Sequence, residues 1–303
     1  MGNFININQL NASELKDLIS NSFNFQKKFY KNNVDQFSNK NVIFLFLEPS
    51  TRTKTSFKIA CSILGINVID VSPENSSMVK GESIENTLST LNSYPVDGIV
   101  IRSANYMDFE KAKEILNYPI INAGSGINSH PTQALSDLKT LNEKFEDFKG
   151  LKMSIVGDLL HSRVASSFIE GFGKYGQKTN LFSPPFFKPK KLNLEIVNFY
   201  DDFEDCLKNS DVIMALRIQK ERLNDLNVDF DEYASKYQIN KKILDEYNIK
   251  YLMHPGPVNE GIEISYGLQN SEKSLINEQV KNGVWVRCAI LDKILRKQGL
   301  WRF

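Results

Sequence analysis

Short apolar runs alternate along this chain with stretches in which apolar residues recur at helical spacing. A short apolar run rich in β formers is typical of a strand, and the second pattern is typical of a helix packed on one side. Regular alternation of the two predicts βαβα units and therefore a parallel sheet flanked by helices. In the first half of the chain the expected strands are Val42–Leu47, Asn67–Val71, Gly98–Ile101 and Ile120–Asn122.

The same alternation restarts in the second half and predicts a second parallel sheet. Its expected strands are Leu151–Val156, Thr179–Phe182, Val212–Leu216 and Lys250–Met253. Two long helical patterns, Pro131–Phe145 and Leu275–Leu295, lie between the two sets and near the end of the chain. We therefore predict an α/β fold of two domains, each with a parallel sheet flanked by helices, joined by two interdomain helices.

The expected domains are residues 1–132, with a C-terminal helix of about 285–303 packing back on them, and residues 133–284. A chain of 303 residues is long enough to bury two cores. Its net charge of +1, without a concentrated basic block, argues against nucleic acid as an obligate partner.

Cys61, Cys206 and Cys288 are far apart and lack metal-ligand spacing. Buried reduced thiols are therefore expected rather than disulfides or a zinc site, which favours a cytoplasmic protein. The N-terminus has neither a basic nor an apolar signal region, and no apolar run approaches the length that spans a membrane. We expect neither export nor membrane insertion.

The turn after the first expected strand carries the strongest chemical signal. Ser50, Thr51, Arg52 and Thr53 follow Pro49 and open a helical stretch. A helix N-terminus offers unpaired N–H groups and the positive end of the helix dipole, and a guanidinium can bond two phosphate oxygens at once. The turn therefore suits a phosphate group, although taken alone such a turn is more often a simple helix cap.

Polar residues also follow the other expected strands. In open α/β sheets ligands bind beyond the carboxyl ends of the strands, so these residues are candidates for one site. Each is weak support alone, because a single Arg or His at a strand end is usually structural. Together they indicate a binding site, and they are Arg102, His130, Gln133, Arg163, Arg217, Gln219 and His254.

Three motifs, in their order and separation, resemble the carbamoyl-phosphate signatures of the aspartate/ornithine carbamoyltransferase family. They are Ser50-Thr51-Arg52-Thr53, His130-Pro131-Thr132-Gln133 and His254-Pro255-Gly256-Pro257. The resemblance covers nearly the whole chain. Within the family, residues 217–222 and Asn259-Glu260-Gly261 resemble the aspartate enzymes, whereas the ornithine enzymes carry Cys where this chain has Pro255.

The resemblance implies transfer of a carbamoyl group from carbamoyl phosphate to the amine of L-aspartate, a step of pyrimidine biosynthesis, without a metal or organic cofactor. Arg102 would reach both the phosphate and the carbonyl group. His130 and Thr53 would bond the carbonyl oxygen as it gains negative charge, and Gln133 and the carbonyl of Pro257 would orient the NH2 group. The residues expected on carbamoyl phosphate are Ser50, Thr51, Arg52, Thr53, Ser76, Arg102, His130, Gln133, Gly256 and Pro257.

The resemblance assigns L-aspartate to Lys80, Arg163, Arg217 and Gln219. A dicarboxylate calls for two cations, and Arg163 with Arg217 supplies them, whereas an ornithine site would not need them. The amine itself attacks and phosphate departs, so no Ser or Cys nucleophile is required. The departing phosphate is a candidate for the proton acceptor.

The polar loop 72–82 has the pattern of solvated surface, yet it resembles the family's swinging loop. In the family a serine and a lysine of this loop enter the active site of the neighbouring subunit, here Lys80 with Ser76 or the adjacent Ser77. The resemblance thus implies a homotrimer with shared active sites. It leaves open a regulatory chain or a pathway enzyme as further partners. The expected catalytic set is Arg52, Thr53, Lys80, Arg102 and His130.

Three other interpretations remain. They are a carbamoyltransferase for ornithine or another amine, a catalytically inactive scaffold, and a dehydrogenase suggested by Val156-Gly157-Asp158, which lacks the glycine spacing of a dinucleotide site. Glu260 replaces a cation common in relatives, with either weaker aspartate binding or a local charge pairing as the result. Glu48 is either a helix-start acid or a partner of Arg163 or Arg217.

Overall fold

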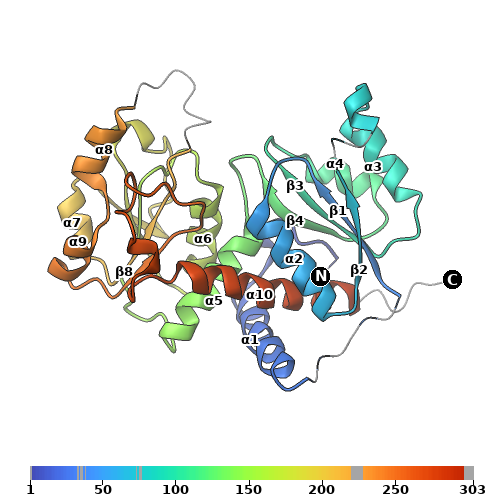
Figure 1. The fold of residues 1–303 in the computed structure, drawn as a ribbon, viewed down its shortest axis with the longest axis horizontal. Helices are drawn as coiled ribbons and strands as arrows, with labels where there is room; N and C mark the ends of the chain where they lie inside the picture. Colours follow the sequence, from blue (N-terminus) through green and yellow to red (C-terminus); the bar gives the residue numbers. More distant parts are fainter. Residues whose placement is uncertain are drawn as a thin grey trace. The chain divides into compact units, whose positions relative to one another are not determined.

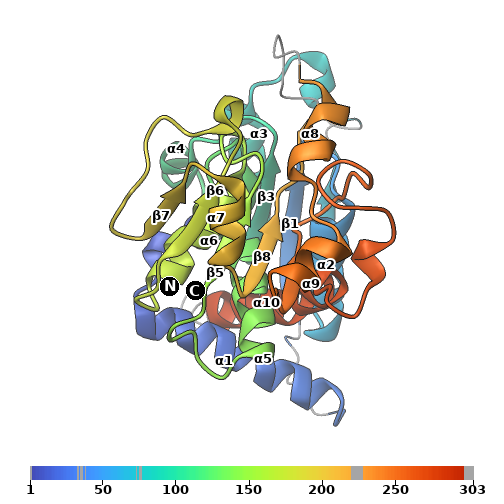
Figure 2. The same cartoon turned by 90° about the vertical axis from the view of Figure 1, so that its left-hand side faces the viewer.

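The computed structural model describes residues 2–32, 34, 37, 39–72, 74, 77–219 and 228–296 (Figures 1 and 2). Contacts divide the chain into two compact units, Met1–Lys139 with Val280–Phe303, and Thr140–Gln279. Two helices, α5 (Pro131–Lys144) and α10 (Ile276–Arg296), run from one unit into the other. The domain boundaries expected from the sequence fall within these same two helices.

The first unit contains a four-stranded sheet in the order β2-β1-β3-β4. All its pairs are parallel, and Phe46 of β1 lies opposite Arg102 of β3. The four strands expected in the first half of the chain are confirmed, with small shifts at their ends. The strands are β1 (Asn41–Phe46), β2 (Asn67–Val71), β3 (Gly98–Ser103) and β4 (Ile120–Ser125).

Helices cover both faces of this sheet (Figure 1). The other helices of the unit are α1 (Ala12–Phe29), α2 (Thr51–Ile63), α3 (Ile84–Asn92) and α4 (Phe109–Ile115). Ile43 and Leu45 pack on α3 and α4, whereas Phe44, which points to the opposite face, meets Phe57 of α2 edge to face at 6.0 Å. Burial on both faces explains why the central strands β1 and β3 are largely apolar, whereas the edge strand β2 has no fully buried residue.

The second unit contains a five-stranded parallel sheet in the order β7-β6-β5-β8-β9 (Figure 2). Its strands are β5 (Met153–Val156), β6 (Thr179–Phe182), β7 (Val197–Tyr200), β8 (Val212–Ala215) and β9 (Tyr251–Met253). Four were expected, but β7 was missed because it is only four residues long and the polar Asn198 interrupts its apolar residues.

The helices of the second unit are α6 (Arg163–Gly173), α7 (Phe203–Lys208), α8 (Phe230–Tyr237) and α9 (Lys241–Glu246). Within each unit the strands run in the same direction, so their carboxyl ends lie along one edge of each sheet. This edge is where the candidate residues of each unit follow their strands. None of the helices in the described part of the chain is both long and apolar enough to cross a membrane.

Candidate active site

The turn from β1 into α2 leaves its hydrogen-bonding groups available to a ligand. Ser50 is the N-cap residue of α2, but its side chain makes no capping hydrogen bond, whereas Ser83 and Ser162 cap α3 and α6 in the usual way. The first turn of α2 contains no acidic residue, and Arg52 within it is exposed. An uncapped helix start with an adjacent guanidinium is a site for an anion.

Thr53, Arg102 and His130 come together beside this turn. Arg102 Nη1 lies 3.4 Å from Thr53 Oγ1 and 3.3 Å from His130 Nε2, and Thr53 Oγ1 lies 3.5 Å from the same imidazole nitrogen. Thr53 and His130 are buried, so these polar groups point to one another in a place largely closed to water. The structure thus brings together three residues that the sequence placed in one site.

The positions of Arg102 and His130 are fixed by their neighbours. Arg102 Nε pairs with Glu48 Oε1 at 2.8 Å, and its Nη1 also donates to the carbonyl of Ala123. Asn122, which is fully buried in β4, donates to Ser129 Oγ at 2.8 Å and so shapes the turn that leads to His130. From the sequence, the expected partners of Glu48 were Arg163 or Arg217. The structure pairs it with Arg102, which was not expected.

Gln133, the third residue of α5, is held by an acid that the sequence did not single out. Its Nε2 donates to Asp137 Oδ1 at 2.8 Å, and Asp137 is fully buried. An available signal was the position of Asp137 among apolar residues of an otherwise buried helix, between Ala134 and Leu138. A charged residue on a buried helix face usually has a partner, because an unpaired buried charge is costly.

In the second unit Arg163 and Arg217 follow neighbouring strands of the sheet. Arg163 is the first residue of α6, after β5, and Arg217 comes two residues after the end of β8. Gln219 Nε2 donates to the carbonyl of His161 at 2.8 Å, which ties the segment after β8 to the loop after β5. Three of the four residues expected to bind L-aspartate therefore follow two adjacent strands, and the fourth, Lys80, belongs to the 72–82 loop.

The loop after β5 also holds a buried pair that the sequence analysis missed. The carboxylate of Asp158 is fully buried, and both its oxygens lie about 3 Å from His161 Nδ1. Burial raises the pKa of Asp158, while the adjacent His161 acts in the opposite direction. The pair shapes the backbone that receives the Gln219 amide.

The His254-Pro255-Gly256-Pro257 turn after β9 is held by its own histidine. His254 Nδ1 accepts a hydrogen bond from Gly256 N at 2.9 Å, so its Nε2 carries the hydrogen that faces Glu263 Oε1 at 3.2 Å. Asn259 N donates to the same carboxylate oxygen. Both ring nitrogens thus shape the turn around Gly256 and Pro257.

The Asn259-Glu260-Gly261 segment is anchored within the second unit. Asn259 Nδ2 donates to the carbonyl of Ile218 at 3.1 Å, which links this turn to the segment of Arg217 and Gln219. Glu260 Oε1 accepts from Gly267 N at 3.1 Å. Glu260 therefore binds backbone of its own loop.

The loop expected to carry Ser76 and Lys80 is described only in part. Ser76 lies outside the described residues, as do Lys220, Glu221 and Arg222 of the aspartate-like segment. Ser77–Lys80 form a short 3-10 helix in which Lys80 is exposed, and the Ser77 hydroxyl donates to Glu82 within the same loop.

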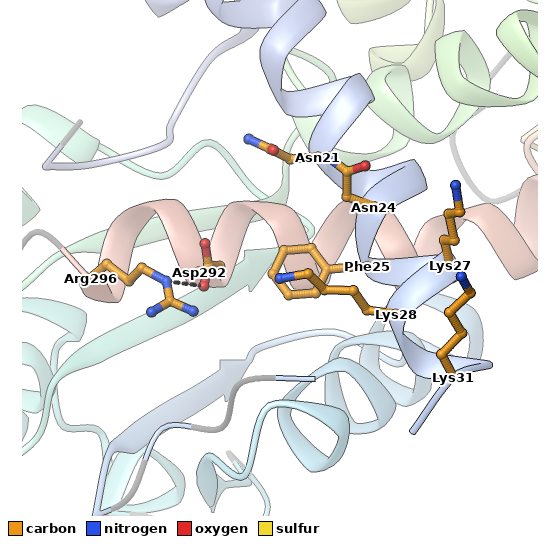
Figure 3. A pocket seen from close by; sticks show the side chains of 8 residues that line it. All are labelled: Asn21, Asn24, Phe25, Lys27, Lys28, Lys31, Asp292 and Arg296. Carbon is orange, nitrogen blue, oxygen red and sulfur yellow. Dashed lines mark hydrogen bonds and ion pairs between the residues drawn. The ribbon is translucent and has the colours of Figure 1, made fainter. Parts of the chain in front are cut away.

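One cavity lies away from all these residues, between α1 and α10 of the first unit (Figure 3). It measures about 470 Å³, and an Arg296–Asp292 ion pair forms part of its wall. Its lining residues are Asn21, Asn24, Phe25, Lys27, Lys28, Lys31, Asp292 and Arg296. Within the described ranges, no three His, Cys, Asp or Glu side chains gather in the way that could hold a metal ion.

Two domain models match the chain. One describes the aspartate/ornithine carbamoyltransferase carbamoyl-P binding domain and matches residues 2–143, and the other describes the Asp/Orn binding domain of the same enzymes and matches residues 149–294. The aspartate carbamoyltransferase catalytic subunit of Caldanaerobacter subterraneus subsp. tengcongensis is 38% identical over 298 residues, which are 97% of this chain and 98% of that relative.

Solved structures agree with this match. Aspartate transcarbamoylase from Trypanosoma cruzi in complex with carbamoyl phosphate is 27% identical, with a TM-score of 0.88 over 97% of this chain and 96% of that one. The catalytic subunit of M. Jannaschii aspartate transcarbamoylase is 29% identical, with a TM-score of 0.86 over 99% of this chain and 100% of that one.

Proposed function

The chain belongs to the aspartate/ornithine carbamoyltransferase family, and we propose that it transfers the carbamoyl group of carbamoyl phosphate to L-aspartate. The products are N-carbamoyl-L-aspartate and phosphate. The observation that carries this proposal is the convergence of Thr53, Arg102 and His130 beside the uncapped start of α2. It supplies donors for a phosphate and for a carbonyl oxygen in one place.

In the first unit we assign the phosphate to the start of α2 and to two arginines. Ser50, Thr51 and Thr53 offer hydroxyl and backbone donors, and Arg52 and Arg102 offer positive charge. These groups also stabilise the leaving phosphate, whose negative charge grows as its bond to carbon breaks.

The carbonyl oxygen of the same substrate is assigned to Thr53, Arg102 and His130. When the amine attacks, this oxygen gains negative charge, and donors already in place lower the barrier without having to reorganise. Gln133 and the carbonyl of Pro257 accept from the NH2 group and set the angle of the carbonyl carbon. The buried bonds of His254 support the Gly256-Pro257 turn in this role.

In the second unit we assign the two carboxylates of L-aspartate to Arg163 and Arg217, with Gln219 as a further donor and Lys80 as a cation from the 72–82 loop. Arg163 and Arg217 follow adjacent strands, and a planar guanidinium can bind a carboxylate with two hydrogen bonds. The uncharged amine attacks the carbonyl carbon, a C–N bond forms, and the C–O bond to phosphate breaks. The departing phosphate takes the proton that the new amide nitrogen loses. These steps need no metal or organic cofactor.

Phosphate release from carbamoyl phosphate tests the function directly. The purified chain is incubated with L-aspartate in one reaction and L-ornithine in another, and the carbamoylated product is identified by mass. We expect release with aspartate only. Release with ornithine only would overturn the assignment of Arg163 and Arg217, and release with neither would favour a non-catalytic scaffold.

We further propose a homotrimer in which Lys80, and Ser76 beside it, complete the site of a neighbouring chain. The exposure of Lys80 at the end of a short helix is compatible with a contact to another chain. Mixed Lys80→Ala and Arg52→Ala chains, each nearly inactive alone, are expected to regain activity after dissociation and reassembly. No recovery, with trimers shown by light scattering, would place each site within one chain.

The proposed place of the reaction is pyrimidine biosynthesis in the cytoplasm. Free, buried Cys61, Cys206 and Cys288 suit a reducing compartment, and burial raises the pKa of the thiols of Cys61 and Cys206 to about 12, which keeps them protonated and unreactive.

A further inference from the structure

Behind the candidate carbamoyl-phosphate site, two helices bury a pair of opposite charges that the proposed mechanism does not use. Asp137 of α5 is fully buried, and Arg287 of α10 is 3% exposed. Burying two charges is expensive unless each is compensated, and such pairs stabilise a fold little compared with apolar packing. Their presence beside a reactive site therefore calls for a functional explanation.

The side chain of Arg287 is surrounded by residues that leave room for its guanidinium. Its guanidinium lies over the ring of Phe57, 5.0 Å from the centroid, and its Nη2 lies 3.4 Å from Thr132 Oγ1. A methyl group at Gly283, one turn earlier in α10, would overlap Arg287 Nη1. Thr132 Oγ1 in turn lies 3.5 Å from His130 Nδ1. The cation thus lies directly behind the His130 motif.

The two charges support one another. Burial, with a smaller contribution from Arg102, lowers the pKa of Arg287 to about 9, whereas Asp137 raises it. A guanidinium with a pKa of about 9 remains mostly protonated at neutral pH, so Arg287 is a buried cation whose charge and that of Asp137 attract each other.

An ionised carboxylate can only accept hydrogen bonds. The Gln133 amide must therefore turn its NH2 group toward Asp137 Oδ1, as the 2.8 Å bond requires, and its carbonyl oxygen Oε1 away from it. With the opposite amide orientation, two oxygens would face each other at the same distance. Asp137 thereby decides which end of the Gln133 amide is left for a ligand.

We propose that Asp137, with the buried cation Arg287 behind it, is a positioning residue that makes Gln133 a hydrogen-bond acceptor and so selects an acyl phosphate that carries an NH2 group. This inference rests on the proposed function, because Gln133 is assigned there to the carbamoyl nitrogen. An acyl phosphate with a methyl group in place of NH2 gains nothing from an acceptor. The Asp137–Gln133 bond would therefore separate carbamoyl phosphate from acetyl phosphate.

The test compares three ligands in the full chain. Carbamoyl phosphate is measured by its KM, and acetyl phosphate and inorganic phosphate by their inhibition constants against it. In Asp137→Asn the side chain can donate as well as accept, so the Gln133 amide loses its fixed orientation. We expect the KM for carbamoyl phosphate to rise at least about tenfold, while the inhibition constants of acetyl phosphate and inorganic phosphate change less than about threefold.

Three further variants isolate the effect. Gly283→Ala keeps every charge but displaces the guanidinium of Arg287, and it should reproduce the selective loss in part. Ser136→Ala removes a buried hydroxyl from the same helix turn and should leave the selectivity unchanged. In a Gln133→Ala background, Asp137→Asn should have no further effect on the ratio of the three constants.

The outcomes separate two kinds of failure. A wild-type chain that releases no phosphate with L-aspartate overturns the proposed function, and with it this inference. An active wild type whose Asp137→Asn variant loses all three ligands equally, or none of them, overturns the inference alone and makes the pair purely structural. If Asp137→Asn does not fold, the Gly283→Ala and Gln133→Ala variants still decide, because a selective loss must appear in both.

Discussion

Each unit of the protein has a histidine-proline turn after a strand, and the two histidines have opposite surroundings. In the first unit His130 Nε2 faces Arg102 and Thr53, two further residues of the candidate site. In the second unit His254 has both ring nitrogens engaged by Gly256 N and Glu263. The same dipeptide at the same kind of place thus gives a candidate catalyst in one unit and an internal brace in the other.

The residues around each histidine, rather than the His-Pro motif itself, therefore determine its role. Arg102 and Thr53 surround His130 with donors, so an incoming oxygen joins an existing cluster. Glu263, a buried acceptor, instead fixes the His254 ring and leaves the backbone of its turn as the part that faces a ligand. Replacing each histidine should therefore affect different properties.

The largest effect is expected for His130→Ala. The loss of one donor to a developing oxyanion typically costs on the order of 100-fold in turnover, or about 3 kcal/mol. Steady-state kinetics with L-aspartate measures it, and circular dichroism checks the fold. Near-normal turnover in a folded variant would remove His130 from the mechanism and make the two histidines alike.

His254→Ala should act mainly on stability. It leaves the buried Glu263 without its imidazole partner and the turn without its Gly256 bond, which we expect to cost about 3 kcal/mol. Urea denaturation followed by tryptophan fluorescence measures the shift of the midpoint. A variant as stable as the wild type but inactive would show instead that His254 takes part in the chemistry.

Glu263→Gln is the milder form of the same change. The Gln carbonyl oxygen can still accept from His254 Nε2 and Asn259 N, so the turn keeps its bonds, and the loss should be below about 1 kcal/mol. Because the turn is preserved, the KM for carbamoyl phosphate should stay within about threefold of the wild type. A loss as large as that of His254→Ala would show that the negative charge itself holds the turn.

The smallest effect is expected for a change at Asp158, the partner of the third histidine, His161, and it concerns the pH dependence of stability. The raised pKa of Asp158 means that the folded state binds this proton more tightly than the unfolded chain, so the carboxyl stabilises the fold at low pH and this contribution is lost as the pH rises through the folded pKa. Asp158→Asn should therefore gain stability relative to the wild type as the pH rises above 3.8, the ordinary pKa of this carboxyl group. The difference between the thermal midpoints of variant and wild type, measured over a series of pH values, tests this gain. A variant that becomes less stable than the wild type as the pH rises would contradict it.

Much of the fold followed from the sequence because the central strands of both sheets are buried, and such strands are visible as apolar runs. The edge strand β7 escaped, since Asn198 in it is exposed and the run is broken. The strand ends could be predicted as the place of the site because parallel strands bring their carboxyl ends to one edge. The expected roles of the site residues came from the resemblance of three motifs to those of the family.

The supporting acids could not be found in the same way. Asp137, Asp158 and Glu263 act through partners that no apolar pattern reveals, and Glu48 pairs with an arginine of another strand. Arg287 was visible as the single charge in the apolar run 284–291 of α10, but its contact with Thr132 joins residues 155 positions apart. Such pairings depend on the folded chain rather than on local spacing.

The division of the chain into two units affects the order in which they can fold during synthesis on the ribosome. The second unit is one continuous stretch, Thr140–Gln279, whereas the first combines Met1–Lys139 with the later segment Val280–Phe303. Synthesis therefore delivers every residue of the second unit before the first unit receives most of α10, with its buried Cys288 and Leu291. The second unit can therefore complete its fold before the first, whereas the N-terminal domain usually folds first during synthesis. Arg287 is synthesised only after the whole second unit, so no segment up to Gln279 can supply the cation that lies behind the His130 motif in the folded chain.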